Sequence, residues 1–235
     1  MKKTLWIAIA GALAASVIAA SAQEVLSANA VGYIKRTVPA GGGFQTFAVS
    51  LNSMTESSNV FGRTSIAAEA PRGTTVYFWS LTPTPGWLSS TKGLSGWNAV
   101  YSNRVVAPGE GFMLKSATTS TVPIEVTITG EVPDVDPLSV AIVGSSNLNM
   151  VANSYPVDVT FGQTLLAINA ARGSVASFWD TTLNGGKGGW LSTTKGLSGW
   201  NAVYSNRVVQ AGEGFMLKEA GVSRVWTNAK PYTWP

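Results

Sequence analysis

Cysteine and histidine are both absent from the 235 residues of this sequence, and charged residues make up only 12% of it. Without thiol or imidazole side chains, the chain has no cysteine nucleophile, no histidine-based triad, no ordinary zinc site and no disulfide. Carboxylate, lysine and hydroxyl groups remain as candidates for catalysis. The share of charged residues is about half the usual value, and it predicts a nearly neutral surface that favours association.

The first 22 residues have the features of a secretory signal peptide. Lys2 and Lys3 precede an apolar run that ends in Ala20-Ser21-Ala22, a pattern typical of a cleavage site. The run is shorter than the ~20 residues of a membrane-spanning helix, and no charged stop signal follows it. We therefore expect a secreted protein, extracellular or at the cell surface, that is not an integral membrane protein.

The charge balance argues against a nucleic-acid partner. Removal of Lys2 and Lys3 leaves 14 basic and 12 acidic residues, a net charge of +2. The remaining lysines and arginines are scattered along the chain, whereas nucleic-acid binding needs a cluster of them on one surface. We expect no nucleic acid among the partners.

An internal repeat organises the chain. Residues 86–115 and 189–218 are identical at 27 of 30 positions, and the three differences are Ser90/Thr193, Ala107/Gln210 and Pro108/Ala211. Upstream, 9 of the 20 residues from 60 to 79 recur 100 positions later. The offset then grows to 103, which places a three-residue insertion at Gly185-Gly186-Lys187, in a predicted loop tip.

The repeat predicts two domains after the signal peptide of residues 1–22. They span residues 23–132 and residues 133–235, and the joint is the proline-containing segment 131–137. Each unit is near the lower end of ordinary domain size and has room for a modest core. We therefore expect the two units to pack against each other.

Strand and turn signals dominate both units. From Val122 to Thr129 apolar and polar residues alternate, which predicts a strand with one buried face. Only residues 63–70 and 163–171 have a helical pattern. The other predicted strands are Val31–Val38, Phe44–Leu51, Thr74–Leu81, Trp97–Tyr101, Gly111–Lys115, Ser139–Val143, Leu148–Ala152, Val175–Trp179 and Val222–Thr227. The fold class is therefore all-β, a tandem of two small antiparallel sandwiches or barrels related by the internal repeat.

One turn occurs in both units with different residues. Pro108-Gly109 suits the two central positions of a type II turn, in which the second residue needs a positive φ. In the second unit the proline is replaced by Ala211, while Gly212 keeps the glycine. The glycine therefore determines the geometry of this turn.

Aromatic residues of the repeated block are the candidate binding residues. They are Trp87, Trp97 and Tyr101 in the first unit, and Trp190, Trp200 and Tyr204 in the second. Exposed rings beside polar residues form platforms on which sugar rings stack. The alternative is that these rings fill the two small cores.

Two catalytic arrangements are weakly supported. Glu110 and Glu213 are repeat mates in different units, and Glu69, Glu125 and Glu131 of the first unit lack acidic partners at matching positions. The acid pair of a glycosidase is therefore unsupported. Ser89 to Lys92 and Ser192 to Lys195 match the S-x-x-K pattern of some hydrolases, but the companion motifs are missing and the segments resemble polar loops. We predict that Glu110 binds backbone amides of its turn or an arginine, and that the protein is not an enzyme and needs no cofactor or metal.

The chain resembles a group of uncharacterised secreted two-repeat β proteins. The resemblance rests on the opening Ser27-Ala28-Asn29-Ala30-Val31-Gly32-Tyr33 and on Pro108-Gly109-Glu110-Gly111-Phe112, whose counterpart in the second repeat begins with alanine. It extends over essentially the whole mature chain. The resemblance implies secretion and a two-repeat β architecture, and it implies no functional residues.

Two functional hypotheses follow from these observations. The first is a structural protein that assembles with itself into an extracellular filament or surface layer, through head-to-tail contacts between repeat domains. The second is a carbohydrate-binding protein with two equivalent sites, at Trp87/Trp97 and Trp190/Trp200, whose partner is a polysaccharide.

Overall fold

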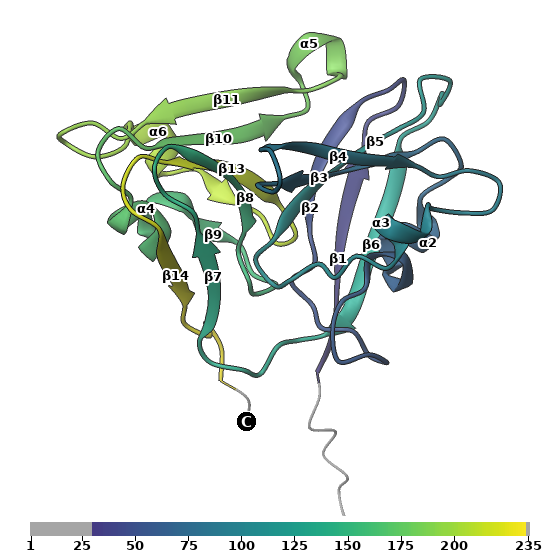
Figure 1. The fold of residues 1–235 in the computed structure, drawn as a ribbon, viewed down its shortest axis with the longest axis horizontal. Coiled ribbons are helices and arrows are strands. Elements are labelled where there is room, and N and C mark those ends of the chain that lie inside the picture. The colour runs from purple at the N-terminus through teal and green to yellow at the C-terminus, as the bar shows by residue number, and fades with distance from the viewer. Residues whose placement is uncertain (1–29, 234–235) are drawn as a thin grey trace, which may run out of the picture. The chain divides into compact units, whose positions relative to one another are not determined.

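The computed structural model of the protein describes residues 30–233, and the predicted signal peptide lies outside the described residues. The chain from Val31 onward forms one compact unit. It is built from antiparallel strands joined by short helices and turns (Figure 1). The all-β prediction with sandwich-like sheets is therefore confirmed.

The strands and helices of the first half recur in the same order in the second half, which adds β9, α5 and β12. The first half contains β1 (Val31–Val38), β2 (Phe44–Ala48), η1 (Phe61–Arg63), α2 (Ser65–Glu69), β3 (Thr75–Ser80), β4 (Gly86–Thr91), α3 (Ala99–Ser102), β5 (Gly111–Lys115) and β6 (Ile124–Glu131). The second half contains β7 (Leu138–Ile142), β8 (Asn147–Ala152), β9 (Val159–Thr160), η2 (Phe161–Gln163), α4 (Leu165–Asn169), β10 (Val175–Asp180), α5 (Leu183–Gly186), β11 (Gly189–Thr194), α6 (Ala202–Ser205), β12 (Val208–Val209), β13 (Gly214–Glu219) and β14 (Arg224–Asn228).

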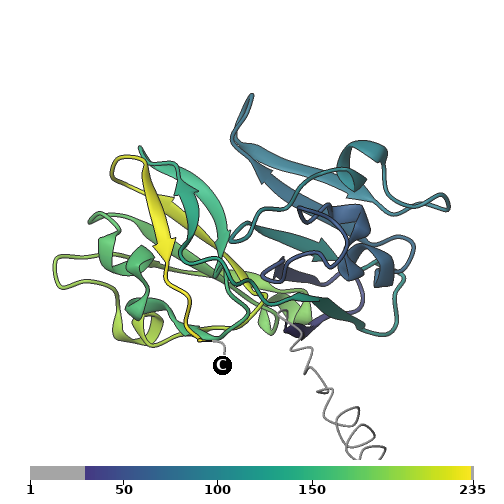
Figure 2. The same ribbon diagram turned by 90° about the horizontal axis from the view of Figure 1, so that it is seen from below.

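Each half pairs a four-stranded sheet with a two-stranded one. The four-stranded sheets have the orders β2-β5-β3-β4 and β8-β13-β10-β11, so matching strands take matching places. The two-stranded sheets are β1-β6 and β7-β14. Figure 2 shows β14, in yellow, beside β7 in the second half. The sheet between β9 and β12 has only two residues in each strand.

Buried and more exposed side chains alternate along β6, as the sequence predicted. Ile124, Val126 and Ile128 are buried, while Glu125 is exposed. Successive side chains of a strand point to opposite faces, so one face of β6 packs on the core and the other faces outward. The strand predicted over Val122–Thr129 is confirmed, with its bounds shifted to Ile124–Glu131.

Two aromatic cores form, one in each half. In the first, the ring of Phe61 lies 5.2 Å from that of Phe78 and 5.8 Å from that of Phe112. In the second, Phe161, Phe178 and Phe215 take the same places. All six are almost fully buried, and burying each such ring stabilises the fold by about 1.5–3 kcal/mol.

The two predicted helical segments are confirmed as short helices. Residues 61–69 form η1 and α2, and residues 161–169 form η2 and α4. In both, the hydroxyl of a threonine, Thr64 or Thr164, accepts a hydrogen bond from a backbone N–H in the first turn of the following helix. This N-cap fixes where the helix starts.

One predicted strand is wrong, and four strands, β4, β9, β11 and β12, were not predicted. Residues 97–101 were expected to be extended, but Ala99–Ser102 form the helical turn α3, because the Asn98 side chain accepts the N–H of Val100 and caps it. Residues 89–92 and 192–195 were expected to be polar loops, but most of each segment lies in β4 (Gly86–Thr91) or β11 (Gly189–Thr194). Their pairing with β3 and β10 supplies the strand structure that their local pattern does not indicate.

The predicted glycine-dependent turn is confirmed in both halves. Gly109 has a φ of 82° and Gly212 has a φ of 71°. The N–H of Glu110 donates to the carbonyl of Ala107 at 2.9 Å, and the equivalent bond joins Glu213 to Gln210. A proline at the preceding position is therefore not needed for this conformation.

Candidate functional site

The repeated turn of each half reaches the edge strand of the other half. The carbonyl of Gly109 accepts the N–H of Ala152 at 2.9 Å. The carbonyl of Gly212 accepts the N–H of Ala48 at the same distance. Ala48 ends β2 and Ala152 ends β8, so the two contacts are reciprocal. The halves pack against each other, as the size of the predicted units suggested.

Glycine is required where the halves meet. A Cβ atom on Gly109 would overlap Val140 Cγ2 and would lie 2.8 Å from Ser154 Oγ. A Cβ on Gly111 would lie 3.2 Å from the Cα of Gly214. The glycines of the repeated turn therefore permit a close approach of backbones between the halves.

Two tryptophans make a second reciprocal pair of contacts. The indole Nε1 of Trp79 donates to the carbonyl of Leu148 at 2.7 Å, and that of Trp179 donates to the carbonyl of Phe44 at 2.8 Å. Phe44 begins β2 and Leu148 lies in β8. Both inner edge strands are thus bonded by side chains of the opposite half. Three methionines from both halves, Met113, Met150 and Met216, form one buried cluster.

Glu110 and Glu213 stabilise their own turns. Glu110 pairs with Arg104 at 2.7 Å and accepts the N–H of Ala107 at 3.2 Å. Glu213 pairs with Arg207 at 3.0 Å, in the same arrangement. The prediction that Glu110 binds a turn amide or an arginine is therefore confirmed, and both carboxylates are engaged in structural contacts.

The lysine of the S-x-x-K pattern caps a helix. Lys92 Nζ donates to the carbonyls of Ala67, Ala68 and Ala70 at the end of α2. Lys195 makes the same three bonds at the end of α4, and its burial lowers the pKa of its ammonium group. A lysine whose three donors are all used this way is not placed to activate a neighbouring serine.

Trp97 and Trp200 pack on the cores. Their indole Nε1 atoms donate to the carbonyls of Ala67 and Ala167, at 3.0 and 2.9 Å. Their rings meet Phe61 and Phe161 edge-on. The predicted partners Tyr101 and Tyr204 stack on the core rings of Phe78 and Phe178.

Trp87 lies across the sheet from Trp97. Along β3, Phe78 points into the core, while the alternate residues Tyr77 and Trp79 point to the opposite face. Trp87 packs against Tyr77 and Trp79 on that opposite face, at ring distances of 6.4 and 5.3 Å. The structure therefore does not bring Trp87 and Trp97 together in one site, contrary to the prediction from the sequence.

Trp87 and Trp190 instead line one shared groove. Its volume is about 480 Å³. The other residues along it are Phe44, Tyr77, Met113, Trp179, Asn184, Gly188 and Gly189. The inserted loop after β10 forms one wall, and the carbonyl of Lys187 in this loop accepts the N–H of Phe44. The groove therefore combines residues of both halves, whereas the sequence suggested two equivalent sites.

The repeated block also exposes apolar side chains at matching positions. Leu94 is 84% exposed and Leu197 is 85% exposed. Val100 and Val203 are 77% and 76% exposed. These side chains lie in the turn after β4 or β11 and in the helical turn α3 or α6. Sequence periodicity did not single them out, because their exposure depends on how the segment folds over α2 or α4.

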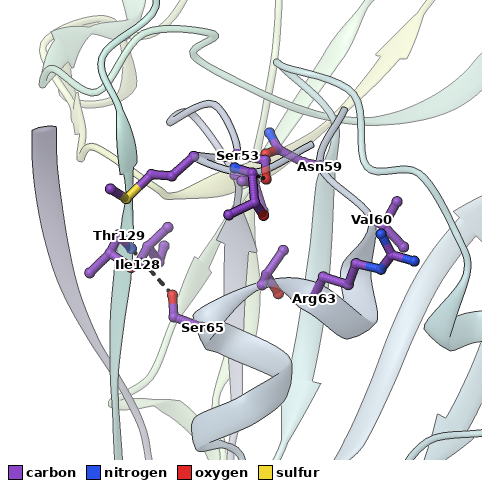
Figure 3. Close-up of a pocket in the computed structure, with 11 residues that line it drawn as sticks. Ser53, Asn59, Val60, Arg63, Ser65, Ile128 and Thr129 are labelled. Carbon is purple, nitrogen blue, oxygen red and sulfur yellow. Dashed lines mark hydrogen bonds between the residues drawn. The ribbon is translucent and has the colours of Figure 1, made fainter. Parts of the chain in front are cut away.

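Another pocket lies between α2 and β6 in the first half (Figure 3). It has a volume of about 170 Å³. The N–H of Thr129 donates to Ser65 Oγ at 3.2 Å across it, and Arg63 pairs with Glu56. Its polar groups serve local packing. Within residues 30–233, no group of three or more Asp or Glu residues is placed to hold a metal ion.

Comparison with family models, with curated proteins and with solved structures finds no match to this chain. The resemblance to secreted two-repeat β proteins therefore stays a prediction. Among the described residues, no helix has both the length and the apolar character needed to cross a bilayer.

Proposed function

We propose that the protein is a secreted structural protein that assembles with itself into an extracellular filament or surface layer. The observation that supports this proposal best is the duplicated exposure of Leu94 and Leu197 and of Val100 and Val203. Core packing places no demand on side chains that are more than three-quarters exposed. Their identity in both halves is therefore consistent with a role on the surface.

Burial of these side chains between copies is energetically favourable. Moving a leucine or valine side chain from water into a packed interface contributes about 1.5–3 kcal/mol. Each chain has two such surfaces, so a contact between unlike halves of successive chains repeats without closing and produces a filament. The mature net charge of +2 offers little electrostatic repulsion to oppose it.

The experiment compares the mature chain, residues 23–235, with a Leu94→Ser plus Leu197→Ser variant. We expect the unmodified chain to form ordered polymers visible by electron microscopy, and the variant to elute as a monomer in size-exclusion chromatography. Val222→Ser is the matched control, because Val222 is also strongly exposed but lies outside the repeated block. An unmodified chain that stays monomeric at millimolar concentration contradicts the proposal.

A second candidate is carbohydrate binding, favoured by the joint position of Trp87 and Trp190 in one groove. Trp87 is 37% exposed and is held edge-on to Trp79, which leaves part of its ring surface accessible for stacking on a sugar. The groove volume of about 480 Å³ lies in the usual range for ligand sites. This version has one composite site in place of two.

Quenching or enhancement of tryptophan fluorescence by soluble polysaccharides tests this candidate. Trp87→Ala and Trp190→Ala are each expected to weaken binding more than tenfold, because they line the same site. Tyr33→Ala, which removes an exposed ring elsewhere, serves as the control. If all three variants bind the polysaccharide equally well, the shared groove is refuted. If each single tryptophan variant instead binds half as many ligands per chain with unchanged affinity, the two tryptophans belong to separate sites.

A further inference from the structure

We propose that the free edges of β4 and β11 pair with the corresponding edges of neighbouring copies, so that the sheets continue from one chain into the next. This inference rests on the proposed self-assembly and names the contact that carries it. β4 is the last strand of the order β2-β5-β3-β4, and β11 is the last strand of the order β8-β13-β10-β11 (Figure 1). Along the part of the chain that the structure describes, neither strand has a backbone partner on its outer side.

The hydrogen bonds at the end of β4 show which backbone groups point outward. The N–H of Lys92 donates to the carbonyl of Thr74 at 2.9 Å, so the backbone of Lys92 faces β3. Backbone groups of an edge strand alternate between the paired side and the free side. The N–H and C=O groups of Trp87, Ser89 and Thr91 are therefore directed away from β3.

The same relation holds at β11. The N–H of Lys195 donates to the carbonyl of Ser174 at 2.9 Å. Alternation then directs the backbone groups of Trp190, Ser192 and Thr194 away from β10. Each half thus presents a row of three outward-facing residues with donors and acceptors available for a further strand.

Features that normally protect an edge strand are missing here. Charged residues, prolines and bulges usually prevent edge-to-edge pairing. Residues 86–91 and 189–194 contain no charged residue and no proline. The nearest lysines, Lys92 and Lys195, have their ammonium groups bound to helix carbonyls. The opposite edges, β2 and β8, are by contrast bonded by the other half of the same chain.

The outward-facing residues are the same in the two strands. Trp87, Ser89 and Thr91 match Trp190, Ser192 and Thr194 without exception. The one difference between the strands, Ser90 against Thr193, falls on a buried side chain whose backbone faces the neighbouring strand. Every copy therefore carries the same free edge twice. A molecule with one such edge can form only a dimer, whereas a molecule with two can form an open-ended polymer.

Hydrogen exchange of the assembled protein measures this pairing directly, with no substitution. We expect the amides of Ser89, Thr91, Ser192 and Thr194 to exchange at least about tenfold more slowly in polymers than in the dilute monomer. The amide of Lys92, already bonded within the chain, is the internal reference and is expected to change little. Unaltered exchange at the four outward amides in well-formed polymers overturns the inference.

Proline substitution tests the same contact by removing the outward donor. Proline is tolerated on an edge strand where its nitrogen faces solvent. The Ser89→Pro plus Ser192→Pro variant is therefore expected to keep the circular dichroism spectrum of the monomer and to lose polymerisation. A Ser90→Pro control places the ring where the N–H faces β3 and is expected to disrupt the hairpin itself.

A second double variant, with lysine in place of proline, tests the contact if the proline variant fails to fold. Ser89→Lys plus Ser192→Lys adds charge to exposed positions on both edges. Loss of polymers with an unchanged melting temperature supports the edge contact. Polymers of undiminished length in the folded variant overturn it while leaving self-assembly intact. A parent chain that never polymerises defeats the proposed function, so the two failures are distinguishable.

Discussion

Trp79 and Leu148 lie 69 positions apart in the chain and are joined by a 2.7 Å hydrogen bond from the indole Nε1 to the backbone carbonyl. The equivalent bond runs in the other direction, from Trp179 to Phe44. Each half therefore bonds the inner sheet edge of the other. This reciprocity explains why residues near the interface recur in both repeats, since each must fit nearly the same surface.

Replacing Trp79 by phenylalanine removes this bond and leaves the Leu148 carbonyl without its indole donor. We expect the free energy of unfolding to fall by about 1–2 kcal/mol, because the bond is partly buried and a hydrogen bond of this kind usually contributes about 0.5–1.5 kcal/mol. Urea denaturation followed by circular dichroism measures the change. Trp87→Phe is the matched control, because Trp87 is more exposed and its indole makes no hydrogen bond among the described residues. Similar losses in the two variants contradict the role of the bond.

Replacing Gly109 by alanine tests the close approach of the halves. At a φ of 82° the alanine is strained by about 1–2 kcal/mol, and its Cβ also overlaps Val140. Gly96 has a φ of 97°, but no atom lies within 4 Å of the place that a Cβ would take, so Gly96→Ala carries the conformational strain alone. Thermal unfolding should show Gly109→Ala to be less stable than Gly96→Ala by about 1–3 kcal/mol. Equal melting temperatures would mean that the interface relaxes without cost.

Removing the ammonium group of Lys92 takes a charged donor from three carbonyls at the end of α2, of which only that of Ala67 keeps a second side-chain donor among the described residues, the indole of Trp97. We expect Lys92→Met to lower the free energy of unfolding by about 1–3 kcal/mol, because hydrogen bonds to charged groups are among the stronger ones. Lys35→Met is the control, since Lys35 is exposed on β1. Chemical denaturation at pH 7 compares the two. If Lys92→Met lowers the free energy of unfolding no more than Lys35→Met does, the lysine cap is not needed for stability.

Glu219 makes the second half sensitive to acid. Burial raises the pKa of its carboxyl, but hydrogen bonds from Gly221, Ala171, Arg224 and Ser174 outweigh burial and leave the pKa below its ordinary value of 4.5. A carboxyl whose pKa is lowered by folding contributes stability that is present above its unfolded pKa. That stability is lost as the pH falls through the folded pKa.

We therefore expect the contribution of Glu219 to the free energy of unfolding to be constant above about pH 5. This contribution should decrease progressively as the pH falls below 4.5, the ordinary pKa of the carboxyl. Glu219→Gln is expected to be less stable than the unmodified chain at pH 7 and to show a smaller loss at low pH. Glu125→Gln, at an exposed position on β6, is the control. Denaturation curves between pH 3 and pH 7 decide the outcome. Parallel curves for Glu219→Gln and the unmodified chain would contradict this role.

The features that could be predicted from the sequence are those with a local cause. Alternation in residues 122–129 indicated a strand with one buried face, because the period of two is a property of the strand itself. Gly109 and Gly212 indicated the turn, because only glycine readily adopts its positive φ. The local pattern of residues 63–70 and 163–171 likewise indicated the short helices, although η1 and η2 begin two residues earlier.

The features that were missed depend on partners far away in the chain. β4 and β11 have no clear alternation of apolar and polar residues in the sequence, and they are strands because β3 and β10 bond to them. The helical turn at Ala99–Ser102 replaced a predicted strand because one side chain, Asn98, caps it. Neither outcome has a strong signal in a window of a few residues.

By itself, the sequence determined the two-fold repetition, the antiparallel β class and the absence of thiol and imidazole chemistry. Only the tertiary structure decided which aromatic rings serve the cores and which line a groove. The reason is physical: Trp87 and Trp97 lie against opposite faces of one sheet. The face of Trp87 follows from the register of β4 with β3, whereas Trp97 lies outside the strands and packs on the core through Phe61. The same applies to the sheet edges, since an edge is free or covered only after every strand has found its neighbours.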